Sequence, residues 1–186
     1  MLTVQRQRGF TIVELLIVIV VIGILAAITI VAFNGIQTKA ENTKTVSAVA
    51  AWAKAIRMFE AERGTWPANN SCLGASTTYD AGVYAGRCWP PNTSGWTVNS
   101  AFLTEMSPYI GSSLPAPSTK PLLSSITATD EYRGAIYYRV SATDIRIYTH
   151  FHGVSTCPDI SGLGAAFSGD NNRTNGRSCY YRLAGP

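Results

Sequence analysis

An acidic side chain stands at the start of the longest apolar run in this chain. The stretch RQRGFTIVELLIVIVV places Glu14 directly before Leu15 to Phe33, a segment without a charged residue. A carboxylate at the edge of a hydrocarbon layer is costly unless a cationic partner meets it, so an ionisable residue there indicates a function. The alternative is that Glu14 lies at the level of the lipid headgroups.

The cysteines are a second set of residues with chemistry of their own. The chain has 4 of them, widely spaced and without a CxxC pair, which favours disulfides in an oxidising compartment over a zinc site. Four cysteines allow three connectivities, and sequence alone does not choose among them. We expect local pairing, Cys72 with Cys88 and Cys157 with Cys179.

Two histidines in THFHG, His150 and His152, are two residues apart on a predicted strand and would share a face. No acidic or cysteine cluster accompanies them in sequence, so we expect surface histidines and no metal.

The late segment DISGLGAAFSGDNN carries oxygen donors of the kind that calcium accepts, but their spacing is not that of an EF-hand loop. We expect ordinary turn residues. The chain also lacks a Ser/His/Asp, Cys/His or paired-carboxylate pattern, so we expect neither an enzyme nor a cofactor. The oxygen donors are Asp159, Asp170, Asn171 and Asn172.

The C-terminal region is mildly basic. A solvated surface is the default interpretation of its arginines, with DNA binding as the alternative. Several tryptophans are expected to be partly exposed and able to serve adhesion. The arginines are Arg173, Arg177 and Arg182, and the tryptophans are Trp66, Trp89 and Trp96.

Glu14 would be positioned by one long helix. Leu15 to Phe33 is long enough to cross about 30 Å of hydrocarbon, and no small-residue cleavage site follows it, so we expect a retained membrane helix. Basic residues without acids precede it, which favours a cytoplasmic N-terminus. The flanking charges are Arg6 and Arg8 before the helix, and Lys39, Glu41 and Lys44 after it.

The helix is predicted to continue beyond the membrane. From Ile36 to Glu62 apolar residues recur at three- and four-residue spacing, so one helix can run from Phe10 to Arg63. Gly64 is a natural C-terminal cap, and Pro67 prevents continuation. Among its residues, Trp52 and Phe59 are expected to pack in the core.

A loop-rich region, residues 68–129, follows, with one short helix predicted over FLTEMSPYI. GAIYYRV and IRIYTHF, joined by SATD, predict a hairpin, and SCYYRL predicts a third strand. In each strand of the hairpin, every second side chain lies on the same face. The two sets are Ile136, Tyr138 and Val140, and Ile145, Ile147 and Thr149.

The stretch RGFTIVELLIVIVVIGILAAITIVAFN resembles the N-terminal signature of type IV pilins and of the related type II secretion pseudopilins. The resemblance implies a leader, residues 1–9, that a prepilin peptidase removes after Gly9, with methylation of the new amino terminus of Phe10. It also implies that Glu14 pairs with the terminal amine of a neighbouring subunit in a helical filament. Where many pilins have a mid-helix proline, this chain has Val31, so local loosening would have to arise at Gly23 or at Asn34-Gly35.

The resemblance implies an α+β fold, in which residues 10–35 form the assembly helix and residues 36–186 an exterior domain with an antiparallel sheet. The implied partners are the membrane, a pilus assembly platform and other copies of the chain. We expect a type IV pilus subunit, held in the membrane before assembly and on the cell surface after it, with DNA or a surface ligand as a further candidate partner. The alternatives are a type II secretion pseudopilin and a monomeric single-pass protein whose exterior domain binds a ligand or DNA.

Overall fold

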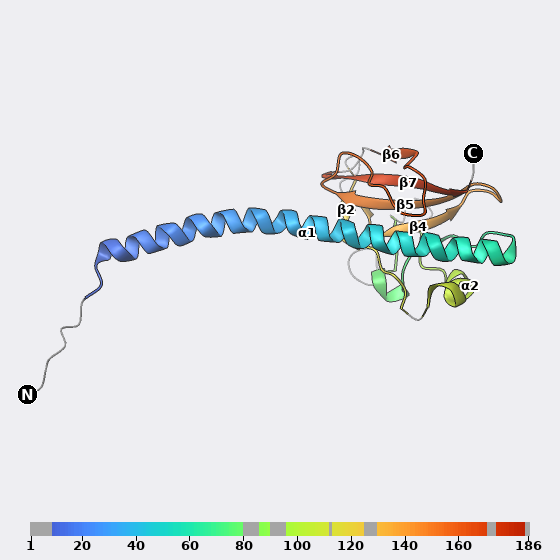
Figure 1. Ribbon diagram of the computed structural model, residues 1–186, viewed down its shortest axis with the longest axis horizontal. Coiled ribbons are helices and arrows are strands. Elements are labelled where there is room, and N and C mark those ends of the chain that lie inside the picture. Colours follow the sequence, from blue (N-terminus) through green and yellow to red (C-terminus); the bar gives the residue numbers. More distant parts are fainter. Residues whose placement is uncertain are drawn as a thin grey trace, which may run out of the picture. The chain divides into compact units, whose positions relative to one another are not determined.

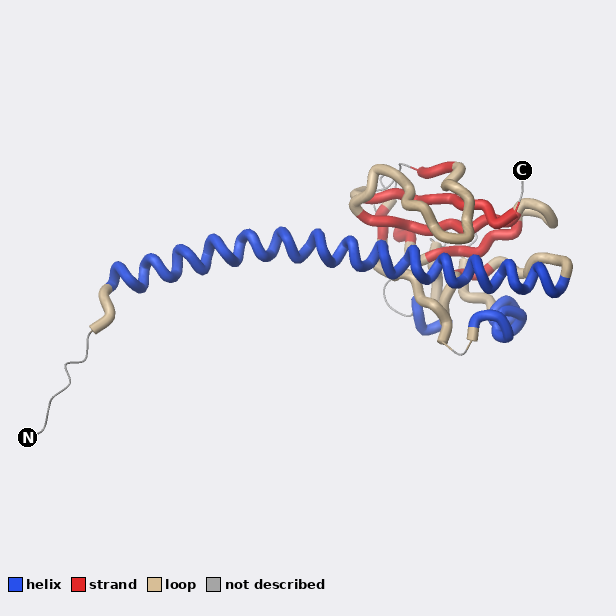
Figure 2. The backbone as a smooth tube through the Cα atoms, viewed as in Figure 1, coloured by secondary structure: helices blue, strands red, loops and turns tan. Residues whose placement is uncertain are grey.

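A computed structural model describes residues 9–79, 86–89, 96–111, 113–124, 130–170 and 174–184. The chain forms two units, Met1–Gln37 and Thr38–Pro186. Helix and antiparallel sheet are combined as the predicted α+β class requires (Figures 1 and 2). The elements are α1 (Ile12–Arg63), β1 (Ser71–Cys72), a 3₁₀ turn (Ser76–Tyr79), α2 (Ser100–Ile110), β2 (Leu122–Leu123), β3 (Glu131–Tyr132), β4 (Ala135–Arg139), β5 (Ile145–His152), β6 (Ser168–Asp170) and β7 (Gly176–Ala184).

Helix α1 is continuous over 52 residues and begins two residues later than predicted. Gly23 and the Asn34-Gly35 pair are helical, so neither position loosens the backbone in this structure. The helix ends where a glycine can adopt a left-handed conformation: Gly64 has φ of 66° and its N–H donates to the carbonyl of Glu60 at 2.8 Å. This is the cap that the sequence predicts.

The main sheet has the strand order β1-β4-β5-β7-β6, with every neighbouring pair antiparallel. The predicted hairpin is β4 and β5, closed by a 2.9 Å hydrogen bond from the Val140 N–H to the Asp144 carbonyl. The predicted third strand is β7, which pairs with β5 along the whole length of β5. A separate two-stranded ladder joins β2 and β3.

The core lies between one face of the sheet and the part of α1 that belongs to the second unit. Trp52 and Phe59 are buried as predicted, and the Trp52 indole N–H donates to the carbonyl of Pro115 at 2.8 Å. Helix α2 adds Phe102, whose ring centroid is 5.8 Å from that of Trp52. The cluster is completed by Val49, Ile56, Tyr137, Ile147 and Tyr181, among others.

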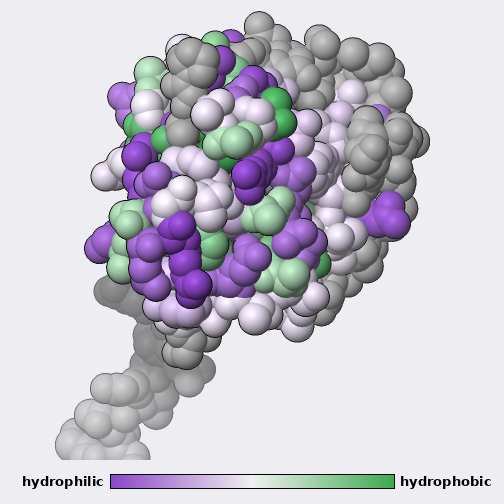
Figure 3. Space-filling model, turned by 90° about the vertical axis from the view of Figure 1, so that its right-hand side faces the viewer, coloured by the Kyte–Doolittle hydropathy of each residue, from purple (hydrophilic) through white to green (hydrophobic). Residues whose placement is uncertain are grey.

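Strand alternation separates this core from the opposite face of the sheet. Tyr137 belongs to the core, whereas Ile136 and Tyr138 belong to a second cluster on the other face. Val140, expected on the face of Ile136, lies beyond the end of β4 and is 44% exposed. At the end of the second unit where α1 stops, the described residues are a mixture of polar and apolar side chains, and none of the coloured surface forms a broad hydrophobic area (Figure 3).

Candidate functional site

The predicted cleavage site lies just before the helix. Gly9 and Phe10 are exposed and are outside any helix or strand, because α1 begins at Ile12. A peptide bond in exposed, non-helical backbone is accessible to a protease, since no helical hydrogen bonds must be broken first. The predicted basic residues Arg6 and Arg8 lie outside the described residues.

Glu14 caps the N-terminus of α1 together with Thr11. Glu14 Oε2 accepts hydrogen bonds from the Thr11 backbone N–H at 2.8 Å and from its hydroxyl at 2.7 Å. In return the Glu14 N–H donates to Thr11 Oγ1 at 3.2 Å. This reciprocal arrangement is a capping box, and it places a negative charge where the helix dipole favours one. Thr11 was absent from the predicted site residues, although T-x-x-E before an apolar run is its sequence signal.

The geometry of this cap leaves the carboxylate available to a further cation. Both hydrogen bonds from Thr11 use the same oxygen, Oε2, and the Glu14 side chain is exposed. A positively charged group can therefore approach without displacing Thr11. The carboxylate can therefore form an ion pair with a cationic group at the end of an apolar helix.

The apolar part of α1 is exposed on every side. The exposed fractions of its large apolar side chains range from 46% at Val18 to 84% at Ile12, and Phe10 is 74% exposed. Within the described residues, α1 is the one helix long and apolar enough to cross a membrane. A helix that is apolar all round must be covered by lipid or by other protein.

Both disulfides are formed, and both are local. Cys72 is bonded to Cys88 and Cys157 to Cys179, with Cα–Cα distances of 5.8 and 5.7 Å. The first joins β1 to residue 88, and the second joins the loop after β5 to β7. In the chain-entropy model each closure stabilises the fold by about 3 kcal/mol.

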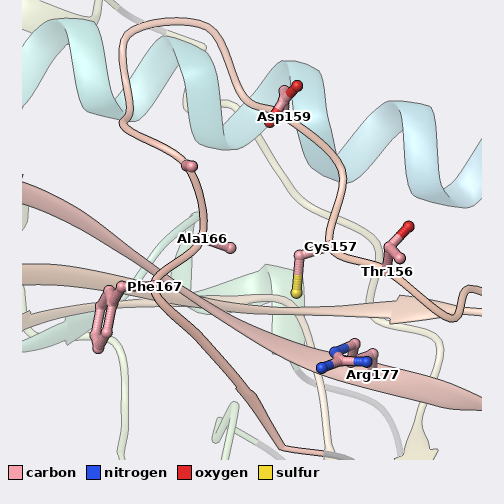
Figure 4. Close-up of a pocket in the computed structure, with 7 residues that line it drawn as sticks. Thr156, Cys157, Asp159, Ala166, Phe167 and Arg177 are labelled. Carbon is pink, nitrogen blue, oxygen red and sulfur yellow. The ribbon is translucent and has the colours of Figure 1, made fainter.

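The loop held by the second disulfide borders a depression of about 370 Å³ (Figure 4). Arg177 lies on one side of it and donates to the carbonyl of Ser155 at 2.6 Å. The Asp159 carboxylate lies on the other side and does not pair with Arg177 (Figure 4). The remaining lining residues include Thr156, Ala166 and Phe167.

The structure describes only part of the set of oxygen donors that calcium could use. Asp159 is exposed, whereas Asn171, Asn172 and the side chain of Asp170 lie outside what the structure describes. In the described part of the chain, no group of three or more His, Cys, Asp or Glu side chains could hold a metal ion.

The two histidines are buried, which corrects the expectation of surface histidines. His150 Nδ1 is 2.9 Å from the hydroxyl of Ser178, and His152 Nε2 is 3.2 Å from the carbonyl of Lys120. The backbone of His152 also exchanges two hydrogen bonds with the Asn42 side chain, at 2.8 and 3.0 Å. Sequence reasoning missed this contact, because α1 and the end of β5 are far apart in the chain. Burial lowers the pKa of His152.

The C-terminal arginines are only partly described. Arg173 lies outside the described residues, and the guanidinium of Arg182 lies over the ring of Phe167, with 4.4 Å to the centroid. The three tryptophans are half-buried, and Trp89 packs edge-on against Tyr132 with ring centroids 4.7 Å apart.

Comparison with known proteins finds a family motif in the N-terminal segment and two kinds of named relatives. Residues 4–30 match the prokaryotic N-terminal methylation motif. The fimbrial protein EcpC of Eikenella corrodens is 35% identical over 74 residues, which cover 40% of this chain and 48% of that protein. A fimbrial protein of Neisseria meningitidis is 32% identical over 74 residues, 40% of this chain and 44% of that protein.

Core proteins of type II secretion systems match this chain at a similar sequence identity. The type II secretion system core protein G of Klebsiella pneumoniae is 37% identical over 71 residues, 38% of this chain and 51% of that protein. That of Dickeya chrysanthemi is 35% identical over 71 residues, 38% of this chain and 46% of that protein. The chain spans about half the length of the curated relatives it matches. No solved structure is significantly similar to it.

Proposed function

We propose that this chain, which carries the N-terminal methylation motif of the type IV pilin and pseudopilin family, is a structural subunit of a type IV pilus. It is processed by a prepilin peptidase and polymerises through α1 into a helical filament used for adhesion, motility or DNA uptake. The observation that carries the proposal is a helix apolar on every side whose first turn holds a capped but accessible carboxylate.

Processing is the first step. The peptidase cleaves between Gly9 and Phe10 and methylates the new amine of Phe10. The exposed, non-helical backbone at these residues supports this assignment. The Thr11 N–H remains an amide after cleavage, so the capping box with Glu14 survives it.

Assembly is the second step. Before it, α1 spans the cytoplasmic membrane with its N-terminus inside, and an assembly platform extracts the subunit into the filament. There the methylated amine of Phe10 meets Glu14 of a neighbouring copy, in surroundings from which water is largely excluded. A charge left alone in such surroundings is strongly destabilising, so the pair sets the register of subunit addition.

The test is the mass and N-terminal sequence of the protein recovered from sheared cell-surface material. The expected chain begins at methylated Phe10 and is abundant in that fraction. Recovery of a chain that begins at Met1 would contradict the proposal. A processed chain confined to membranes would instead favour the second candidate.

The second candidate is a pseudopilin of a type II secretion system. The similarity to core protein G of two species supports it. The two disulfides and the long loop region between α1 and β4 favour a pilin. Deletion of the gene separates the two: loss of surface filaments with normal protein secretion indicates a pilin, and the reverse indicates a pseudopilin.

A monomeric single-pass protein with a ligand-binding or DNA-binding exterior domain is the remaining alternative. It requires neither cleavage after Gly9 nor a charge at Glu14. Normal binding of the ligand or DNA by a chain that is not cleaved after Gly9 would favour this alternative.

A further inference from the structure

A cavity of about 400 Å³ lies in the second unit where its part of α1 begins. It is bordered by this helix, by the segment that leads into β2, by the end of β5 and by the turn before β7. We call it the Lys120 cavity. None of its lining residues belongs to the N-terminal site around Glu14. They include Thr38, Lys120, Pro121, Leu123 and Thr174.

Hydrogen bonds between distant segments hold the walls of the Lys120 cavity. The Gly153 N–H donates to the Asn175 carbonyl at 2.8 Å, and the Thr174 N–H donates to the Leu123 carbonyl at 3.0 Å. The two hydrogen bonds between His152 and α1 fasten the end of β5 to the helix. The cavity is therefore formed before a ligand arrives, so binding loses little conformational entropy.

The Lys120 ammonium is the cation of this cavity. Lys120 is exposed, and in the described part of the chain it makes no ion pair with a carboxylate. The acidic residue Glu41 is half-buried on α1 and acts from nearby: the pKa of His152 is lowered mainly by burial, and the charges of Lys120 and Glu41 act on it with opposite sign. A lysine without a carboxylate partner, beside the hydroxyl-bearing residues Thr38 and Thr174, suits a phosphate group.

The same cavity also has an apolar border. Pro121 is exposed, and Leu123 is 40% exposed. Both follow Lys120 closely in sequence and line the cavity with it. A free phosphate ion gains nothing from such a border, whereas a phospholipid carries apolar chains directly beyond its phosphate and gains from burying them. The cavity therefore fits a ligand with an anionic part and an apolar part.

The position of Thr38 in α1 indicates the depth of the cavity relative to a membrane. Thr38 follows Phe33, the last residue of the apolar run, by five residues, which is about 7.5 Å along a helix. The headgroup layer on each side of a bilayer is roughly 5–8 Å thick. When Leu15 to Phe33 fills the hydrocarbon layer, Thr38 therefore lies among the lipid headgroups.

We propose that the Lys120 cavity binds the headgroup of an anionic phospholipid, with the phosphate at Lys120 and the start of the acyl chains against Pro121 and Leu123. The inference rests on one part of the proposed function, that α1 crosses the membrane, and requires neither cleavage after Gly9 nor a filament. Extraction of the subunit from the membrane then requires the release of this lipid.

Binding is measured by native mass spectrometry of the full chain in nonionic detergent, titrated with dioleoyl phosphatidylglycerol, dioleoyl phosphatidylcholine or inorganic phosphate. We expect phosphatidylglycerol to bind about fivefold more tightly than phosphatidylcholine, which is the effect of one lysine on an anionic lipid. Inorganic phosphate at the same concentration should not displace phosphatidylglycerol, because it has no apolar part to bury.

Substitutions test which residues recognise the lipid. Lys120→Gln should remove the preference for phosphatidylglycerol, and Lys120→Arg should retain it. Thr174→Leu should weaken binding of both lipids, because the larger side chain fills the cavity. The matched control is Lys39→Gln, which should keep the preference, since Lys39 is exposed next to Thr38 but does not line the cavity. An unchanged melting temperature verifies that each variant is folded.

Three results would overturn the proposal. The first is equal affinity of the wild-type chain for the two lipids. The second is a loss of preference in Lys39→Gln as large as that in Lys120→Gln, which would reduce the effect to a general attraction between basic residues and anionic lipid. The third is displacement of phosphatidylglycerol by inorganic phosphate at the same concentration, which would assign the cavity to free phosphate.

A separate measurement distinguishes failure of this inference from failure of the proposed function. The wild-type chain is reconstituted into phosphatidylcholine vesicles and washed with alkaline carbonate. Retention of the chain in the vesicles is expected for a membrane-spanning α1, and any of the three results above would then refute the lipid site alone. Release of the chain by carbonate would contradict the membrane-spanning helix, and with it both the proposed function and this inference.

Discussion

Glu14 caps α1, and we propose that it is also the ion-pair partner of a neighbouring subunit's terminal amine; two substitutions separate these two roles. Glu14→Gln removes the charge but keeps an oxygen able to accept from Thr11, since glutamine also forms capping boxes. Thr11→Ala removes the hydroxyl that donates to Glu14 at 2.7 Å and accepts at 3.2 Å, and leaves the charge in place. Only the first substitution affects pairing with the amine of a neighbouring subunit.

The free-energy costs expected for Glu14→Gln and Thr11→Ala differ enough for an assembly assay to separate them. Loss of one partner of a buried ion pair costs about 3–5 kcal/mol, which weakens subunit addition by about a hundredfold to several thousandfold. Loss of a helix cap costs about 1 kcal/mol, or roughly fivefold. Glu14→Gln should therefore abolish surface filaments, whereas Thr11→Ala should only reduce them.

The assay is an immunoblot of sheared surface filaments, normalised to the processed subunit in the membrane fraction. Mass spectrometry of the membrane pool verifies that both variants are still cleaved after Gly9. If Glu14→Gln assembled at the wild-type level while Thr11→Ala did not, the amine-pairing argument would be wrong. Glu14 would then be a helix cap alone.

Three further predictions concern the second unit. Replacing Cys157 and Cys179 together by serine should cost about 3 kcal/mol and lower the melting temperature, as measured by circular dichroism; an unchanged melting temperature would show that the closed loop adds no stability. Trp52→Ala should cost about 3–5 kcal/mol in urea unfolding, because it leaves a cavity and an unpaired carbonyl at Pro115, while Trp52→Phe should cost less. The pKa of His152 is lowered in the folded state, so the unfolded chain binds more protons than the folded one. The free energy of unfolding should therefore fall as pH decreases below about 6.5, the ordinary pKa of histidine. A His152→Gln variant whose stability has the same pH profile would refute this cause.

The signal in the first thirty residues is local, so the motif and the long apolar helix could be predicted from sequence, whereas cleavage after Gly9 and the pairing of Glu14 stay predictions. A basic leader, a glycine, an aromatic residue and a glutamate stand at fixed spacing before an apolar run, and the same stretch contains the T-x-x-E pattern of the cap at Thr11. Helix α1, its end at Gly64 and the β4–β5 hairpin were predictable for the same reason. Each depends on periodicity or on a residue with special backbone preferences.

Contacts between distant residues were decided by the tertiary structure. The histidines were expected at the surface, yet packing buries them and joins His152 to Asn42 of α1, 110 positions away in sequence. Strand periodicity gives two faces to each strand, but only tertiary packing decides which face joins the main core under α1 and which joins the second cluster around Ile136.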